Sequence, residues 1–257
     1  MLSIAITLVI ACIAFGSDKT VARVPAKLSQ QAEEFQPVAL IELFTSQGCS
    51  SCPSADYLLM QTINAAKKEG RNIFALSFHV DYWNRLGWTD PFSTKEYSQR
   101  QNEYASELNL NSVYTPQMIV NGTSEFVGSD SKKLEAALNK SLNENPAAAF
   151  KALSASLQYN AAPKVKFALD GNFADCKINF ALVSINETTS VNRGENDGLI
   201  LTNQHVVRQF ISIAATAEGE VSFKNRPIPS AGNMAIVAYI QHNGDLKIIG
   251  AAKAEIK

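Results

Sequence analysis

The chain has 257 residues, which suggests one large domain or two modest ones. Apolar residues make up 46%, a fraction typical of a packed globular protein, and this excludes extensive disorder. The 23 basic and 24 acidic side chains leave a formal net charge of −1. This charge excludes the basic surface that nucleic-acid binding requires and the polybasic segment expected of a protein bound to an anionic membrane.

Residues 1–16 have the pattern of a secretory signal peptide. They carry no charged side chain, and their apolar core is too short to span a membrane. Small side chains at the end of this run predict cleavage before Ser17, after which residues 17–36 form a polar linker. The four residues that end in Cys12 also resemble a lipoprotein box, so a lipid anchor there is the alternative. Export would place the mature protein in the periplasm or outside the cell, where disulfides persist.

From residue 37 to residue 145, apolar runs alternate with helical patterns, which predicts an α/β domain. We expect strands over 37–44, 73–80 and 117–120, and helices over about 55–70, 95–108 and 134–142. The helix over 95–108 is polar and is expected on the surface.

Residues 146–257 lack a helical period and show the alternation of half-buried strands, as in Val165, Phe167 and Leu169. An Asn-Gly turn at residues 243–244 predicts a hairpin near the C-terminus. We therefore expect an antiparallel β-sandwich-like domain of about six to eight strands, with the domain boundary near residues 143–150.

A Cys-x-x-Cys pair, Cys49 and Cys52, follows the first predicted strand and opens a predicted helix. This spacing allows the two sulfur atoms to form a disulfide. The N–H groups and partial positive charge at a helix N-terminus favour the thiolate, which would lower the pKa of Cys49 from its usual value near 8.5. The pattern predicts Cys49 as an exposed nucleophile and Cys52 as the resolving thiol.

Thr115 and Pro116 stand directly before the strand over 117–120. Thioredoxin-like folds place a cis-proline beside the active disulfide at such a position, and the combination with Cys-x-x-Cys is more specific than either motif alone. We expect a cis bond before Pro116 and a Thr115 backbone that faces the substrate strand.

Several stretches resemble the bacterial family called domain of unknown function 1223, secreted proteins with a thioredoxin-like domain. The matching stretches are Glu42–Pro53, Phe78–Pro91, Tyr114–Gly122, Arg193–Asn196 and Val206–Arg208. The resemblance covers most of the mature chain and implies a thioredoxin-like layer that carries the Cys49/Cys52 pair and a cis-proline at Pro116. It leaves the substrate open. Ser54 departs from the family pattern, where a second proline is expected.

Other candidate site residues flank these motifs. Glu42, a carboxylate in an apolar strand, is expected to move the proton of Cys52 or, alternatively, to be a satisfied hydrogen-bonded group. Trp83 and Trp88 share one loop at the end of the sheet where ligands bind, and they predict a substrate-binding surface; plain packing is the alternative. His79 and Asp81 stand at the same end of the second strand and are included in this predicted substrate-binding surface; the alternative is that they are hydrogen-bonded anchors of the loop.

The sequence thus predicts an exported thiol–disulfide oxidoreductase that acts on protein or small-molecule thiols and disulfides. It would need an unidentified redox-recycling partner, but no cofactor and no metal, because the cysteines carry the electrons. The alternative is a binding module whose Cys49–Cys52 disulfide is structural. A lesser alternative is copper handling with His79 as third ligand, whereas zinc is disfavoured because a single Cys-x-x-Cys supplies too few ligands. Cys176 is expected to be an inert buried thiol.

Overall fold

The computed structural model describes residues 35–157, 161–225 and 231–256, which belong to one compact unit. The predicted signal peptide, the position of Cys12 and nearly all of the predicted linker lie outside the described residues. Among the described residues, no helix is both long and apolar enough to cross a membrane.

The first part of the described chain alternates strands and helices. Its elements are β1 (Ala39–Thr45), α1 (Cys52–Glu69), β2 (Ile73–His79), the 3-10 helix η1 (Asn84–Leu86), α2 (Lys95–Glu107), β3 (Gln117–Val120), β4 (Ser124–Val127) and α3 (Ser131–Leu142). The strands predicted over 37–44, 73–80 and 117–120 correspond to β1, β2 and β3. The sequence pattern missed β4, a four-residue strand.

The second part is almost entirely strand. Its elements are β5 (Ala148–Ser156), β6 (Lys164–Gly171), β7 (Cys176–Ser190), β8 (Ile200–Ala214), β9 (Glu218–Ser222), the 3-10 helix η2 (Ala231–Asn233), β10 (Met234–His242) and β11 (Ile248–Glu255). The predicted C-terminal hairpin corresponds to β10 and β11, which pair antiparallel.

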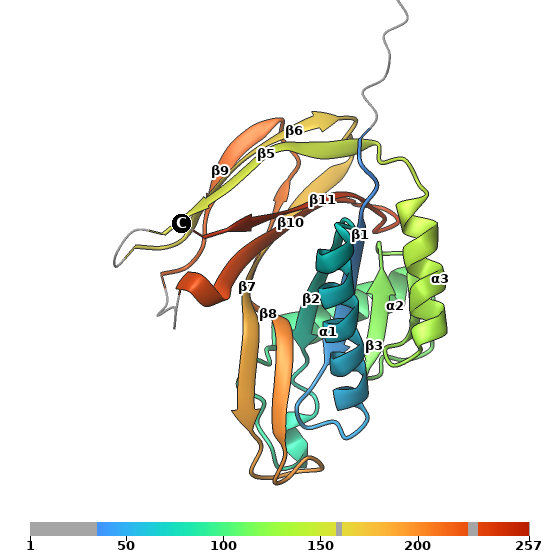
Figure 1. Cartoon of the computed structure of the whole chain (residues 1–257), viewed down its shortest axis with the longest axis vertical. Helices are drawn as coiled ribbons and strands as arrows, with labels where there is room; N and C mark the ends of the chain where they lie inside the picture. The colour runs from blue at the N-terminus through green and yellow to red at the C-terminus, as the bar shows by residue number, and fades with distance from the viewer. Residues whose placement is uncertain (1–34, 158–160, 226–230, 257) are drawn as a thin grey trace, which may run out of the picture. The chain divides into compact units, whose positions relative to one another are not determined.

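One eight-stranded sheet runs through both parts of the chain, in the order β11-β10-β7-β8-β2-β1-β3-β4 (Figure 1). β1 and β2 are parallel, whereas β3 and β4 form an antiparallel hairpin beside β1. β8 joins the edge of β2, where Ser77 pairs with Val206. The predicted boundary near residues 143–150 therefore marks a change of pattern, but the main sheet continues across it.

A second antiparallel sheet, β5-β6-β9, packs against part of this main sheet. Their shared core joins Val165 and Phe167 of β6 to Phe180 of β7 and Ile236 of β10. The sandwich-like packing predicted for the second part is thus built from one sheet of its own and from strands that extend the main sheet.

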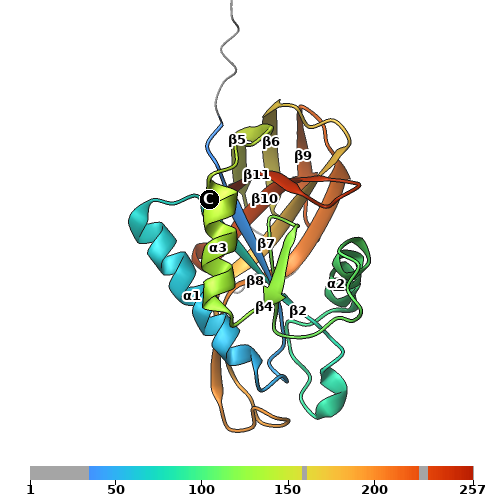
Figure 2. The same cartoon turned by 90° about the vertical axis from the view of Figure 1, so that its right-hand side faces the viewer.

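Helices cover the two faces of the main sheet around β1. α1 and α3 pack on the face that carries Ile41 and Leu43, and α2 packs on the opposite face with Leu40 and Phe44 (Figure 2). The sequence fixes the limits of α1 locally. Pro53 stands in its first turn, where a missing N–H costs no hydrogen bond, and Gly70 ends it in a left-handed conformation with φ 66°.

α2 differs from the expected surface helix, because much of it is buried. Tyr97, Arg100, Gln101 and Tyr104 lie in the interior, and Arg100 pairs with Glu42 of β1. The polar composition of this helix predicts exposure, but its polar groups satisfy one another inside the protein.

Candidate active site

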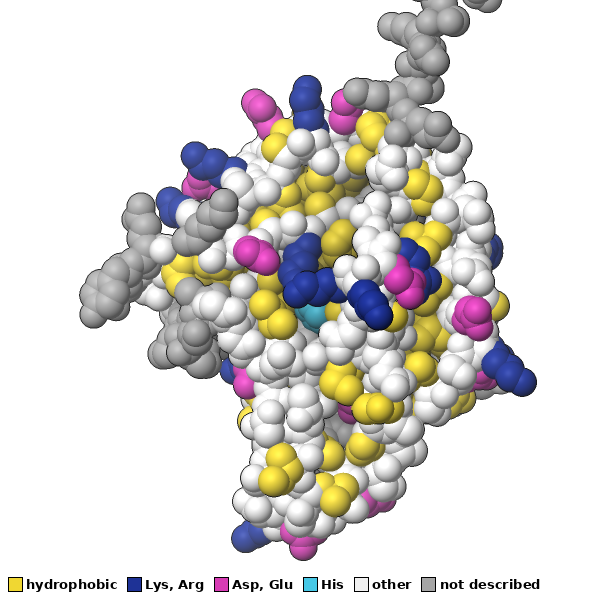
Figure 3. Space-filling view, viewed as in Figure 1, with side chains coloured by type: hydrophobic (Ala, Val, Ile, Leu, Met, Phe, Trp, Pro, Cys, Tyr) yellow, Lys and Arg dark blue, Asp and Glu magenta, His cyan; other side chains and the backbone are white. Residues whose placement is uncertain are grey.

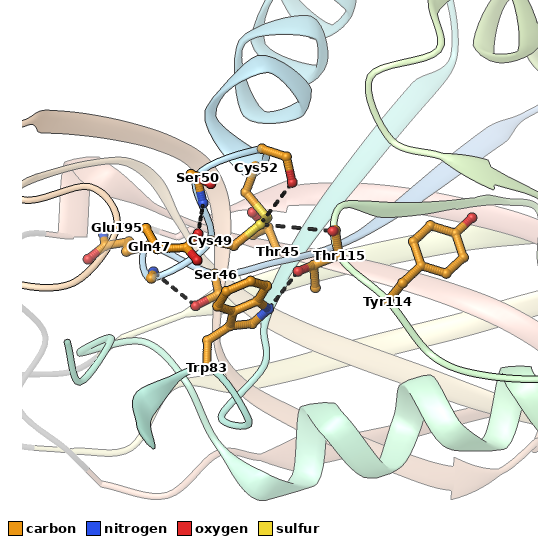
Figure 4. Close-up of a disulfide and its surroundings, with 12 residues drawn as sticks. Thr45, Ser46, Gln47, Cys49, Ser50, Cys52, Trp83, Tyr114, Thr115 and Glu195 are labelled. Carbon is orange, nitrogen blue, oxygen red and sulfur yellow. Dashed lines mark hydrogen bonds between the residues drawn. A yellow bond between two sulfur atoms is a disulfide. The ribbon is translucent and has the colours of Figure 1, made fainter. Parts of the chain in front are cut away.

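The Cys49–Cys52 disulfide lies in the turn between β1 and α1, with 5.4 Å between the two Cα atoms (Figure 4). α1 begins at Cys52, so Cys49 precedes the helix instead of standing at its first position. The turn is closed by backbone hydrogen bonds: the N–H of Cys49 donates to Ser46 at 3.2 Å, and the N–H of Cys52 donates to Cys49 at 3.2 Å. The disulfide therefore sits at the carboxyl end of a central strand.

The loop before β3 lies against Cys49. Its Thr115–Pro116 peptide bond is cis, as expected, and the carbonyl oxygen of Thr115 is 3.9 Å from the Cys49 Sγ. The Ser51 hydroxyl contacts the same sulfur at 3.3 Å. The structure thus brings Cys49, Cys52, Thr115 and Pro116 together, as the sequence predicts.

Both cysteines are fully buried, with exposed fractions of 0%. The expectation of an exposed Cys49 is therefore wrong for this disulfide form. The reason is that side chains from later in the chain fold over the turn. Trp83 packs near Gly48 and donates an indole hydrogen bond of 2.7 Å to the Thr115 hydroxyl, so it spans the two loops that hold the sulfur (Figure 4).

Trp88 contacts the Cys-x-x-Cys turn through Gln47. Its indole N–H donates to the Gln47 side-chain oxygen at 3.3 Å, and the Gln47 amide in turn donates to Asn203 of β8 at 3.1 Å. Both tryptophans are partly buried. They lie beside the disulfide, as expected, but each contributes a hydrogen bond within the protein.

A buried carboxylate lies on α1 one turn after Cys52. Asp56 is 7% exposed, and one of its oxygens accepts a hydrogen bond of 3.2 Å from the Thr45 hydroxyl. The other oxygen, Oδ1, has no hydrogen-bond partner. Burial raises the pKa of Asp56 from 3.8 to about 6, against smaller opposing effects of His79 and Thr45. Because positions i and i+4 share a helix face, Asp56 and Cys52 lie on the same side of α1.

His79 and Asp90 form a buried pair next to this carboxylate. The His79 Nδ1 is 2.7 Å from Asp90, and its Nε2 has no hydrogen-bond partner. Burial alone would lower the pKa of His79, but the charge and hydrogen bond of Asp90 outweigh it and raise the pKa above 6.5. Asp90 also accepts the backbone N–H of Gln47 at 2.8 Å. The pair therefore anchors the Cys-x-x-Cys turn and lies near Asp56, where the charge of His79, when protonated, opposes the rise in the pKa of Asp56.

Glu42 is not the carboxylate beside Cys52. Successive residues of a strand alternate between faces, and Glu42 lies on the α2 face of β1, opposite α1. There it is 0% exposed and accepts two hydrogen bonds from Arg100, at 2.9 and 3.0 Å, together with bonds from Tyr104 and Tyr239. The structure thus corrects the expectation that Glu42 moves the proton of Cys52, and bears out its alternative as a hydrogen-bonded group.

Asp81 contacts α2. It binds Ser98 of α2 through its carboxylate and its backbone N–H, so it anchors the loop after β2. No group of three or more His, Cys, Asp or Glu side chains in the described ranges has an arrangement that could hold a metal ion. Cys176 is buried, and burial raises its pKa, as expected for an unreactive thiol.

The loop between β7 and β8 reaches the disulfide turn from about 145 residues further along the chain. Asn196 is 3% exposed, and its amide donates to the carbonyl oxygens of Gln47 at 2.9 Å and Cys49 at 3.0 Å. Glu195 accepts the backbone N–H of Ser50 at 3.0 Å. The sequence pattern predicts no role for Glu195 or Asn196, because their contacts with the turn are made across the fold.

Comparison with known proteins links the chain to a protein family and to solved structures. A crystal structure of a protein from Agrobacterium tumefaciens is 28% identical, with a TM-score of 0.64, and the match covers 85% of this chain and 95% of that one. A domain of the outer membrane lipoprotein Omp28 from Porphyromonas gingivalis is 13% identical and covers 44% of this chain and 89% of that one, but its TM-score of 0.28 supports no inference. No curated protein matches. The model of the family described as protein of unknown function (DUF1223) matches residues 40–241, and this chain belongs to that family.

Proposed function

We propose that this protein is an exported thiol–disulfide oxidoreductase whose redox centre is Cys49–Cys52. The observation that carries the proposal is the unpartnered carboxylate oxygen of Asp56, buried on the same face of α1 as Cys52. A buried carboxylate costs free energy, and a static disulfide has no need of it. An exchange-active pair needs a nearby proton acceptor, because the resolving thiol must lose a proton before it can attack.

The chemistry follows from these positions. In the dithiol form, the Cys49 thiolate attacks one sulfur of a partner disulfide, and the partner's other sulfur leaves as a thiolate. The Cys52 thiol then gives its proton to the Asp56 carboxylate, and the new thiolate attacks the Cys49 sulfur. This attack forms the Cys49–Cys52 disulfide and releases the second partner thiolate. The same steps in reverse oxidise a partner dithiol, and a separate dithiol or disulfide partner restores the starting state.

The arrangement of the first part of the chain supports a thioredoxin-like interpretation. A parallel β1–α1–β2 unit precedes an antiparallel β3–β4 hairpin and α3, and the Thr115 carbonyl borders the sulfur. Export remains a proposal that rests on the pattern of residues 1–16. On the face shown in Figure 3, acidic and basic side chains are interspersed, and this mixture agrees with a thiol or protein substrate rather than a polyanion.

The second candidate function is a binding module with a structural disulfide, and the full burial of both cysteines favours it. The reduction potential separates the two functions, because structural disulfides usually lie below about −300 mV and exchange-active ones above it. Equilibration of the whole protein with glutathione and with dithiothreitol measures it. A potential above about −300 mV supports exchange, and a lower value supports the structural role.

A further inference from the structure

The contact between Glu195 and Ser50 is the feature that the exchange mechanism leaves unused. Glu195 lies in the β7–β8 loop, and its Oε2 accepts the N–H of Ser50, the residue directly after Cys49, at 3.0 Å. Hydrogen bonds from the Ser50 hydroxyl and backbone N–H hold the pKa of Glu195 below its usual value, so the carboxylate is ionised at neutral pH. A negative charge therefore stands beside the first cysteine.

The position of this charge is fixed by the neighbouring residue. Asn196 is buried and binds the carbonyl oxygens of Gln47 and Cys49, so the loop is attached to both sides of the turn. Glu195 and Thr115 approach Cys49 from opposite sides in the close-up view (Figure 4). The contact with Ser50 is thus part of a clasp of the β7–β8 loop, defined here as Glu195 and Asn196, and not a chance approach of a surface side chain.

In this clasp, Glu195 accepts the Ser50 N–H, a hydrogen-bond donor that a Cys49 thiolate could otherwise use. Backbone N–H groups at the start of a helix stabilise a nearby thiolate. Here the N–H of Cys52 donates to the Cys49 carbonyl, and the N–H of Ser50 donates to Glu195. When the disulfide is reduced, the Cys49 thiolate competes with a carboxylate for the Ser50 N–H and is repelled by its charge.

Building on the exchange function proposed above, we propose that Glu195 is a positioning residue that biases the Cys49–Cys52 couple toward the disulfide. Disfavouring the thiolate disfavours the dithiol form and lowers the reduction potential of the couple, since an oxidant of this type is strong when its reduced form is stabilised. A lower potential suits the protein to give two electrons to a partner disulfide. The overall exchange then converts the partner disulfide to a dithiol and the protein dithiol to Cys49–Cys52, and a dithiol-bearing recycling partner reduces it again.

The test is Glu195→Gln, which removes the charge but keeps a side-chain oxygen that can accept the Ser50 N–H. Asp197→Asn is the matched control, because Asp197 is an exposed carboxylate in the same loop. The equilibrium constant with a glutathione or dithiothreitol buffer is measured for the whole protein and for each variant. Two unit charges a few ångströms apart in water-like surroundings change an equilibrium constant by roughly three- to tenfold, and a tenfold change is about 30 mV for this two-electron couple.

We expect Glu195→Gln to shift the equilibrium about three- to tenfold toward the dithiol, and Asp197→Asn to shift it less than twofold. The effect of Glu195→Gln should shrink at about 1 M salt, where screening acts within about 3 Å, whereas a purely structural change would persist. No shift in Glu195→Gln, or an equal shift in both variants, would overturn the inference.

The outcome also separates this inference from the proposed function. If the wild-type potential lies below about −300 mV, the exchange function fails. A salt-sensitive shift in Glu195→Gln, measured against dithiothreitol, would still support the electrostatic role of Glu195 in that case. If the wild-type potential is higher but insensitive to Glu195, the exchange function stands and the role of Glu195 fails.

Discussion

The Trp83 indole N–H donates to the Thr115 hydroxyl at 2.7 Å, and this bond joins the loop after β2 to the loop before β3. Cys49 lies between these loops and is fully buried. We therefore expect that Trp83 must move before a partner sulfur reaches Cys49, so that this hydrogen bond acts as a closure over the disulfide.

Trp83→Phe should open this closure, because it keeps an aromatic ring but removes the donor to Thr115. A neutral hydrogen bond is worth about 0.5–1.5 kcal/mol, so reduction of the disulfide by a small phosphine should accelerate roughly two- to tenfold. Trp88→Phe is the control, since it removes an indole hydrogen bond to Gln47 and not to Thr115. Equal rates in both variants and the wild type would show that Trp83 does not limit access.

Asp56→Asn should slow exchange while it stabilises the fold. The loss of the proton acceptor should slow resolution of a mixed disulfide by about 100-fold, as measured by release of a chromogenic thiol bound to Cys49. An unchanged rate would remove Asp56 from the proposed mechanism.

The stability effect of Asp56→Asn should depend on pH with a defined sign. The pKa of Asp56 is raised from 3.8 to about 6, so folding favours its protonated form. This contribution is complete below pH 3.8 and is lost as the pH rises through 6. The buried carboxylate thus costs up to about 3 kcal/mol near pH 8, and the neutral variant avoids this cost. Urea titrations should show a gain in stability for Asp56→Asn at pH 8 and almost none at pH 4.

Glu42→Gln should lower the stability of the fold and leave the exchange rate almost unchanged, the opposite of Asp56→Asn. The change leaves the buried Arg100 guanidinium without its counter-charge, and breaking such a pair costs about 3–5 kcal/mol. The exchange rate per folded molecule should stay within about twofold of the wild type, because Glu42 lies on the far face of β1 from Cys52. A large loss of exchange without a loss of stability would restore Glu42 to the mechanism.

Asn196→Asp should loosen the β7–β8 loop from the turn. The substitution replaces an amide that donates to two carbonyl oxygens with a carboxylate that repels them, which should cost about 2–3 kcal/mol. Asn192→Asp makes the same charge change at an exposed position of the same loop and should cost less than about 0.5 kcal/mol. Thermal unfolding of the two variants in parallel measures the difference.

The sequence predicted the elements whose signal is local. β1 and β2 are continuous apolar runs, and α1 has an apolar stripe and a glycine at its end. The residues of each element are therefore enough to predict it. β5 was not predicted, because its residues do not alternate regularly between buried and exposed positions. The pairing of β8 with β2 could not be predicted, because it joins segments about 130 residues apart through a single registered pair.

The same division holds for the site. Cys49, Cys52 and Pro116 were found because their spacing carries the signal. Asp56 was missed because a polar residue inside a helical stripe resembles a solvent-exposed position, although its spacing of four from Cys52 was a usable clue. The role of Glu195 depends on a contact made across the fold, which no local pattern encodes.

Partner trapping tests the order of attack. Cys52→Ser should leave Cys49 joined to its partners, because no thiol remains to resolve the mixed disulfide. Cys49→Ser should trap none, and it is the matched control. Non-reducing gels of both variants, with the disulfide-linked species identified by mass, provide the measurement. Equal trapping by both variants would contradict the assignment of Cys49 as the nucleophile.

The reduction potential of Cys49–Cys52 in the intact protein tests the central claim most directly. The fraction of disulfide is followed by mass after alkylation, across glutathione and dithiothreitol buffers of increasing reducing strength. The account predicts a two-electron transition above about −300 mV, followed by faster alkylation of Cys49 than of Cys52 in the dithiol form. A transition below that value, with both thiols alkylated equally, would contradict it and would identify the disulfide as structural.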